Sequence, residues 1–164
     1  MLLDCKAVFA GGIEEIPIDY RPDLGARDAL AAYGFVEPAR VQGRISNCAG
    51  VVTVSFAVDA RLRQDCDRCA EPFERAYRFS GAYVLVQETN GDIPDDYIVL
   101  PDAQLDMDDL CESCILLHMP SKVLCREDCK GLCPVCGQNL NVKTCSCAAR
   151  SVDPRLEALR QLLE

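Results

Sequence analysis

The chain has 164 residues, 12 of them cysteine, and a formal net charge of −9 at neutral pH. This length allows one domain with a hydrophobic core, or such a domain with a small metal-stabilised module attached. The hydrophobic fraction of 49% excludes a wholly disordered chain, and the negative charge excludes a protein whose entire surface binds nucleic acid. No apolar run reaches the length of a membrane span, and the first residues lack the features of an export signal, so we expect a cytoplasmic protein.

The first half of the chain is expected to be β-rich. Residues 2–9 and 13–20 are predicted as strands, and residues 23–33 as a short helix. From Val52 to Arg63 apolar and polar residues alternate, which predicts a long strand with one buried face. Turn signals before and after this strand predict an antiparallel meander over about residues 41–87.

An acidic loop follows at 88–96, then a short strand at 97–100 and a helix at 105–118. The first turn of this helix is acidic, which suits the helix dipole, and the spacing of Leu110, Cys114 and Leu117 predicts one buried face.

The expected fold class is α+β, an antiparallel β-rich body with a C-terminal acidic helix and a small cysteine-rich zinc module. We expect the body and its helix over residues 1–118, the zinc module over residues 119–150 and a last helix over residues 151–164.

Six cysteines fall within residues 125–147, spaced C-x3-C-x3-C-x2-C-x8-C-x-C. This loop is rich in Gly, Pro, Asn and Lys, so its thiols have no apolar surroundings and must serve as metal ligands or disulfides. A reducing cytosol favours metal, and zinc takes four ligands in a tetrahedron. Cys133 and Cys136 have the form of a zinc knuckle, in which the turn points its amides at the sulfurs and Gly137 permits the tight backbone. The other two ligands come from the remaining four candidates, Cys125, Cys129, Cys145 and Cys147.

One zinc ion is therefore predicted, and two are an alternative. Six thiols are too many for one tetrahedral zinc and too few for two, so a second ion needs another pair. Cys66 and Cys69, in a turn between two predicted strands, are one such pair, although a plain β-turn with two semi-buried thiols explains them equally well. Cys111 and Cys114 are the other candidate pair, although their spacing on a helix favours core packing. We interpret the remaining cysteines, Cys5 and Cys48, as structural. His118, the one histidine, is expected to bond to the last carbonyls of the helix rather than to a metal.

Charge is unevenly spread along the chain. Between Arg78 and Lys122 there is no Lys or Arg, while from Lys122 to Arg150 five basic residues stand against two acidic ones, a difference of +3. The acidic and the basic stretch are ordinary solvated surface, or they form an acidic face and a small basic knob, a protruding basic patch, that bind separate partners. The candidate RNA or partner contacts on the knob are Arg126, Lys130 and Lys143. Motifs for catalysis are missing: there is no P-loop, no G-x-S-x-G and no histidine beside a candidate cysteine nucleophile, so we expect neither an enzyme nor a small-molecule substrate.

Three motifs give the chain a resemblance to the YceD family, the large ribosomal RNA subunit accumulation proteins. The turn CDRCAEPF at 66–73 is similar to the family's C-x-R-C-L-x-P-F, with Ala70 in place of the usual leucine. The acidic helix is followed at 124–141 by LCREDCKGLCPVCGQNLN, which resembles the family's cysteine block, and DPRL at 153–156 resembles its ending. Cys111 and Cys114 stand where the family helix usually carries other residues.

The resemblance implies a cytoplasmic bacterial or plastid protein that supports processing or accumulation of large-subunit (23S) ribosomal RNA and ribosome biogenesis, with no reaction attached to it. The implied partners are ribosomal RNA, a pre-ribosomal particle or a basic ribosomal protein. The alternative function is a thiol-based redox or zinc sensor, in which oxidation within residues 125–147 releases the metal.

Overall fold

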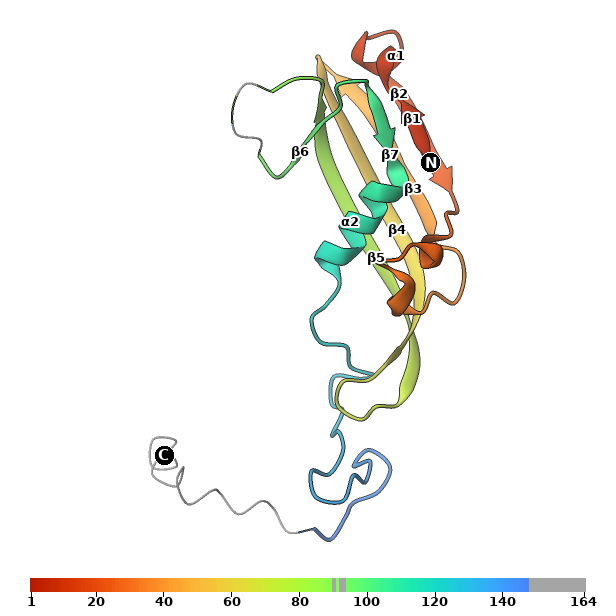
Figure 1. The fold of residues 1–164 in the computed structure, drawn as a ribbon, viewed down its shortest axis with the longest axis vertical. Helices are drawn as coiled ribbons and strands as arrows, with labels where there is room; N and C mark the ends of the chain where they lie inside the picture. The colour runs from red at the N-terminus through yellow and green to blue at the C-terminus, as the bar shows by residue number, and fades with distance from the viewer. Residues whose placement is uncertain (90, 92–93, 148–164) are drawn as a thin grey trace.

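The centre of the molecule is a five-stranded sheet, shown in Figure 1; the computed structural model describes residues 1–89, 91 and 94–147. The strands lie in the order β2 (Glu15–Tyr20), β3 (Arg40–Cys48), β4 (Val51–Asp65), β5 (Pro72–Val86) and β6 (Tyr97–Val99). The first four form an antiparallel meander, and β6 pairs with β5 in parallel. A separate antiparallel ribbon pairs β1 (Leu2–Asp4) with β7 (Gln104–Asp106). The expected α+β class with an antiparallel β-rich body is confirmed.

Helix α2 (Met107–His118) lies across one face of the sheet (Figure 1). The Asp106 carboxylate caps it by accepting a hydrogen bond from the backbone N–H of Asp108 at 2.9 Å. The helix begins two residues later than predicted because the preceding residues pair with β1. Its buried side has the i, i+3, i+4, i+7 spacing of an amphipathic helix and consists of Met107, Leu110, Cys111, Cys114 and Ile115.

One side chain of this helix was predicted wrongly. Leu117 was expected on the buried face, but it is 76% exposed. At roughly 100° per residue, position 117 lies about 90° away from the centre of the buried stripe, in the last turn of the helix.

The N-terminal predictions were partly wrong. The strand predicted over 13–20 is present as β2, but of residues 2–9 only Leu2–Asp4 form a strand. The Asp4 carboxylate accepts the backbone N–H of Lys6 at 2.9 Å, and the chain turns there into the short helix α1 (Lys6–Phe9). The helix predicted over 23–33 is two separate 3₁₀ turns, Leu24–Ala26 and Ala31–Tyr33. Leu24 and Leu30 are both buried, and on one α-helix a spacing of six residues would point them about 120° apart. The C-terminal helix predicted over 151–164 lies outside the described residues.

Phe56, in the middle of β4, occupies space left by two glycines. The register sets it directly between Gly43 of β3 and Gly81 of β5, and the residue is 4% exposed. A Cβ atom on Gly43 would lie 2.2 Å from the carbonyl oxygen of Ser55 and 2.7 Å from the Cβ of Phe56. The long hairpin of β4 and β5 thus has a closely packed middle, from which its far end extends to residues 66–71. In the part of the chain that the structure describes, no helix is long and apolar enough to cross a lipid bilayer.

Substituting Gly43→Ala should lower the free energy of unfolding by about 1–3 kcal/mol, because the added methyl group has no space beside Ser55 and Phe56. Urea denaturation followed by circular dichroism measures the change. The matched control is Gly12→Ala, where the nearest atom to the new Cβ would be at 3.5 Å, an ordinary contact. Equal stability of the two variants would contradict this account of the hairpin.

Candidate metal centres

Eight of the twelve cysteines gather into two groups of four at one end of the molecule. The first tetrad consists of Cys66, Cys69, Cys125 and Cys129, and the second of Cys133, Cys136, Cys145 and Cys147. Within each tetrad the four sulfur atoms lie within 4.8 Å of one another. All twelve cysteines lie in the described part of the chain, and all are free thiols.

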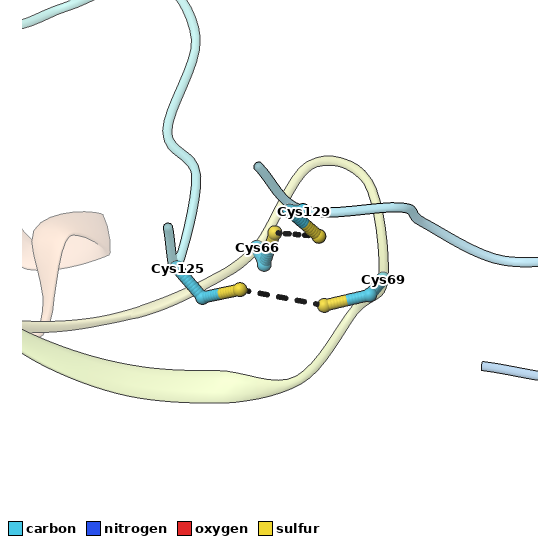
Figure 2. Close-up of side chains that lie close together, drawn as sticks. All are labelled: Cys66, Cys69, Cys125 and Cys129. Carbon is cyan, nitrogen blue, oxygen red and sulfur yellow. Dashed lines mark hydrogen bonds between the residues drawn. The ribbon is translucent and has the colours of Figure 1, made fainter. Parts of the chain in front are cut away.

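The first tetrad joins two parts of the chain that are distant in sequence (Figure 2). Cys66 and Cys69 lie in the turn between β4 and β5, whereas Cys125 and Cys129 lie in the segment after α2. The Sγ atoms of Cys66 and Cys129 are 3.7 Å apart, as are those of Cys69 and Cys125. Around a tetrahedral zinc with Zn–S bonds of about 2.3 Å, sulfurs are separated by roughly 3.8 Å, so the four donors fit such an ion.

Contacts around the first tetrad hold its two segments together independently of the sulfurs. The backbone N–H of Asp67 donates to the carbonyl of Val123 at 2.9 Å. The guanidinium group of Arg68 donates to the carbonyl of Cys129 at 2.9 Å, and that of Arg75 to the carbonyl of Leu124 at 2.7 Å. The sequence places Cys66 and Cys69 in a tight turn, and these bonds bring the second pair to it.

Most of the first tetrad is also shielded from solvent. Cys66, Cys69 and Cys129 are 2%, 4% and 3% exposed, and Phe73 and Leu124 pack against them. Burial raises the pKa of Cys66, but backbone N–H groups of Cys125, Arg68 and Cys69 outweigh it and lower this pKa to about 6. Burial, with the neighbouring thiols, raises the pKa of Cys125 to about 12.

The second tetrad is local, since its four cysteines all lie within fifteen residues of loop, 133–147. Cys133 begins a knuckle in which the N–H of Val135 donates to its Sγ at 3.5 Å, as the spacing predicted. Gly137 has a φ of 72°, and its N–H donates to the carbonyl of Cys133 at 2.9 Å. This tetrad is less buried than the first: Cys136 is exposed, and Cys145 and Cys147 are half-buried.

Protonation differs within the second tetrad as it does within the first. The backbone N–H groups of Cys136 and Val135 lower the pKa of Cys133 to about 6. The thiol of Cys136, together with burial, raises the pKa of Cys147 to about 12. Because thiolates this close repel one another, part of each tetrad resists ionisation. A soft dication removes that repulsion, so both donor sets have the chemistry of an all-sulfur metal site.

The pairing of cysteines was the part left open by the sequence. Spacing indicated the knuckle but left Cys125/Cys129 and Cys145/Cys147 as equal candidates to complete it. In the structure Cys145 and Cys147 lie beside the knuckle, and the upstream pair lies beside Cys66 and Cys69. The sequence signal for a second site is the number of thiols, because the six of residues 125–147 and the pair Cys66/Cys69 together make two complete tetrahedra.

The other sulfur and imidazole groups lie apart from the tetrads. Cys5, Cys111 and Cys114 are fully buried in the core, and Cys48 is exposed at the end of β3. The Nδ1 atom of His118 lies 2.9 Å from the carbonyl oxygen of Cys114, one turn earlier in α2, and can bond to it only as a donor. The histidine thus caps the helix end as expected.

The three candidate contact residues lie in the segments that carry the tetrads. Arg126, Lys130 and Lys143 are all exposed, and Arg126 lies 3.5 Å from the carboxylate of Asp128. Sequence reasoning missed that the same loop also exposes aliphatic side chains, Leu132 at 41% and Val135 at 66%. A knuckle turn is too short to bury its own apolar residue, which is the signal that could have found Val135.

Comparison with known proteins agrees with this arrangement of motifs. The family model described as "Large ribosomal RNA subunit accumulation protein YceD" matches residues 54–163, which include both tetrads. The chain is also 28% identical over 131 residues to the uncharacterized protein YlbN of Bacillus subtilis, covering 79% of this chain and 76% of that protein. No solved structure matches. Since the family model covers more than half of the sequence, the chain belongs to the YceD family.

Proposed function

We propose that each tetrad binds one zinc ion. The support is geometric: in each tetrad four sulfurs lie within 4.8 Å of one another. The first tetrad has sulfur pairs at 3.7 Å, and in the second a backbone N–H donates to the Sγ of Cys133. All-sulfur tetrahedral sites with no open position are typical of structural zinc. The first zinc would link Cys66 to Cys129, which are 63 positions apart, and Cys69 to Cys125, which are 56 positions apart. The second zinc would close a single loop. The proposal therefore replaces the one-ion expectation with two ions of different structural roles.

We further propose that the protein is a non-enzymatic, cytoplasmic factor that supports accumulation of large-subunit ribosomal RNA. The family description carries this proposal. Its contact with RNA would be made by Arg126, Lys130 and Lys143, which are exposed around the metal sites. A reducing cytoplasm would keep the eight thiols available for metal.

Electrostatics limits this contact to a few phosphates. The whole chain carries −9, and a zinc ion with four thiolates carries a formal charge of about −2. No large positive field surrounds the module, so attraction must come from individual cations at short range. The acidic first turn of α2, with Asp108 and Asp109, would face away from RNA or toward a basic ribosomal protein.

A second candidate function, a thiol-based redox or zinc sensor, rests on one observation. Cys136 is exposed, while three of the four thiols of the first tetrad are buried and Cys125 is half-buried, so oxidant would reach the second tetrad first. Titration with peroxide and a metal-release readout separates the two functions. A sensor should lose one zinc at low oxidant, and a structural site should keep both.

Native mass spectrometry should find two zinc ions per chain. Cys69→Ser, in the first tetrad, and Cys145→Ser, in the second, should each remove one ion and leave the other, because the tetrads share no ligand. Elemental analysis of the same samples identifies the metal. A wild-type chain with a single ion, or loss of both ions in both variants, would be inconsistent with two separate sites.

Replacing Arg126, Lys130 and Lys143 together by serine should weaken binding to large-subunit ribosomal RNA. The slope of log affinity against log salt should become shallower by roughly 2, because about 0.7 is lost with each of three phosphate contacts to single-stranded RNA. Fluorescence anisotropy at several salt concentrations measures both quantities.

The matched control for this experiment removes three exposed arginines from the sheet, Arg44, Arg61 and Arg63, which are 61%, 57% and 70% exposed. It changes the net charge equally at another place. If the control weakens binding as much as the first variant, general charge and not the metal-bound loop determines affinity. If neither variant has an effect and ribosomal proteins are captured instead, the partner is a protein.

A further inference from the structure

The loop that carries the second tetrad contributes a side chain to the first. Asn141 lies between the two cysteine pairs of the second tetrad, after Cys136 and before Cys145. Its Nδ2 atom nevertheless lies 3.2 Å from the Sγ of Cys129, a member of the first tetrad. The amide therefore donates to a sulfur of the neighbouring site.

The orientation of the Asn141 amide is fixed by its other contacts. Its Oδ1 atom accepts the backbone N–H of Lys130 at 2.8 Å, so the nitrogen of the amide is the atom that faces the sulfur. The backbone N–H of Asn141 and its Nδ2 both donate to Oδ1 of Asn139, at 2.9 Å and 3.0 Å. Asn139 in turn donates to the carboxylate of Glu71 in the β4–β5 turn, at 3.2 Å.

Backbone hydrogen bonds also attach this part of the loop to the turn that carries Cys66 and Cys69. Leu132 and Asn139 form an antiparallel bridge, and the N–H of Leu140 donates to the carbonyl of Gly131 at 2.9 Å. The N–H of Leu132 donates to the carbonyl of Arg68, in the turn between Cys66 and Cys69, at 3.0 Å. A Cβ on Gly131 would lie 3.0 Å from that same carbonyl oxygen, and its φ is 75°, so glycine allows the close approach.

A donor to a metal-bound thiolate is expected to matter for the metal. Partners of the ligands orient them and adjust their charge, and their loss typically costs 10–100-fold in metal affinity. Asn141 occupies this position for Cys129. Since both of its flanking cysteine pairs belong to the second tetrad, closing that tetrad fixes the ends of the segment that presents the amide.

We infer that Asn141 is a positioning residue that couples the two metal sites, so that each site holds its ion more tightly when the other is filled. The inference depends on the proposal that both tetrads bind zinc. The coupling is reciprocal, because a free energy that links two binding equilibria acts equally on both.

The most direct test replaces Asn141→Asp in the full-length chain. Aspartate keeps the shape and the oxygen that accepts the N–H of Lys130, but it replaces the donor with a carboxylate oxygen facing Cys129. Competition with a chromophoric chelator should show the first-tetrad zinc held about 10-fold more weakly. Asn141→Ala, which removes the donor without adding charge, should show a smaller loss in the same direction.

Val142→Asp is the matched control. It adds the same charge at the next residue, whose side chain is 79% exposed. Zinc affinity in this variant should equal that of the wild type, and far-ultraviolet circular dichroism should confirm that all variants keep the β-rich body. Equal zinc affinity in Asn141→Asp and Val142→Asp would overturn the inference.

Coupling is then measured with a double-mutant cycle. Cys145→Ser with Cys147→Ser disables the second tetrad, and this should weaken the first site about 10-fold when Asn141 is present and have little effect when it is aspartate. If the loss of affinity caused by the two serine substitutions is the same with asparagine and with aspartate at position 141, the effects are independent and the coupling is overturned, even if both ions bind. A wild-type chain that binds fewer than two ions overturns both the inference and the two-zinc proposal, so the two failures are distinguishable.

Discussion

The meeting of four thiols from two distant segments is the constraint on which the C-terminal part of the structure depends. Without the first tetrad and its hydrogen bonds, the segment after α2 has few apolar residues with which to pack against the body. The satellite cluster that holds it consists of cysteines with Phe73, Leu124 and Cys125 at its margin. In place of a larger hydrophobic core, sulfurs and backbone hydrogen bonds attach the segment to the β4–β5 turn. A metal at this point would act as a long-range link in a short chain, which is the usual role of structural zinc.

The β-rich body positions half of this site, because the long β4–β5 hairpin places the turn with Cys66 and Cys69 at one end of the molecule. The β4–β5 hairpin pairs without interruption from Val52 to Asp65, and the glycines beside Phe56 allow its middle to pack closely. Helix α2 crosses one face of the sheet and delivers the chain toward the turn (Figure 1). The sheet, the helix and the turn therefore act together to bring residues 66–69 and 125–129 into one cluster.

Much of the fold could be predicted from the sequence, because period-two alternation fixes which face of β4 is buried and acidic residues mark the start of α2. The parallel pairing of β6 with β5 could not, since successive strands joined by a short connection usually pair antiparallel. The pairing of β1 with β7 could not either, since the two strands are far apart in sequence and three-residue strands carry little pattern. The 3₁₀ turns around Leu24 and Leu30 were missed because the composition of residues 23–33 favours a helix and does not reveal that both leucines are buried. The knuckle was predictable from its spacing, whereas the division of eight thiols into two tetrads required the hairpin register and the path of the chain after α2.

The arrangement also changes how the basic residues are interpreted. Lys130 and Lys143 lie on a loop whose conformation is tied to both tetrads, so their positions relative to each other depend on sulfur chemistry more than on local helix or strand formation. Bound metal would add to the hydrogen bonds that hold this loop, which would link any contact with RNA to metal content. The family description and the geometry of the thiols thus point to one unit, in which the second tetrad shapes the loop and the first attaches it to the body.

X-ray absorption at the zinc edge tests the central claim most directly, because it reports the ligands of every bound ion. Two separate sites of four cysteines predict a first shell of four sulfurs per zinc at about 2.3 Å, with no nitrogen or oxygen ligand and no zinc–zinc scattering. A mixed shell with nitrogen or oxygen, or a zinc–zinc peak from bridging thiolates, would contradict it.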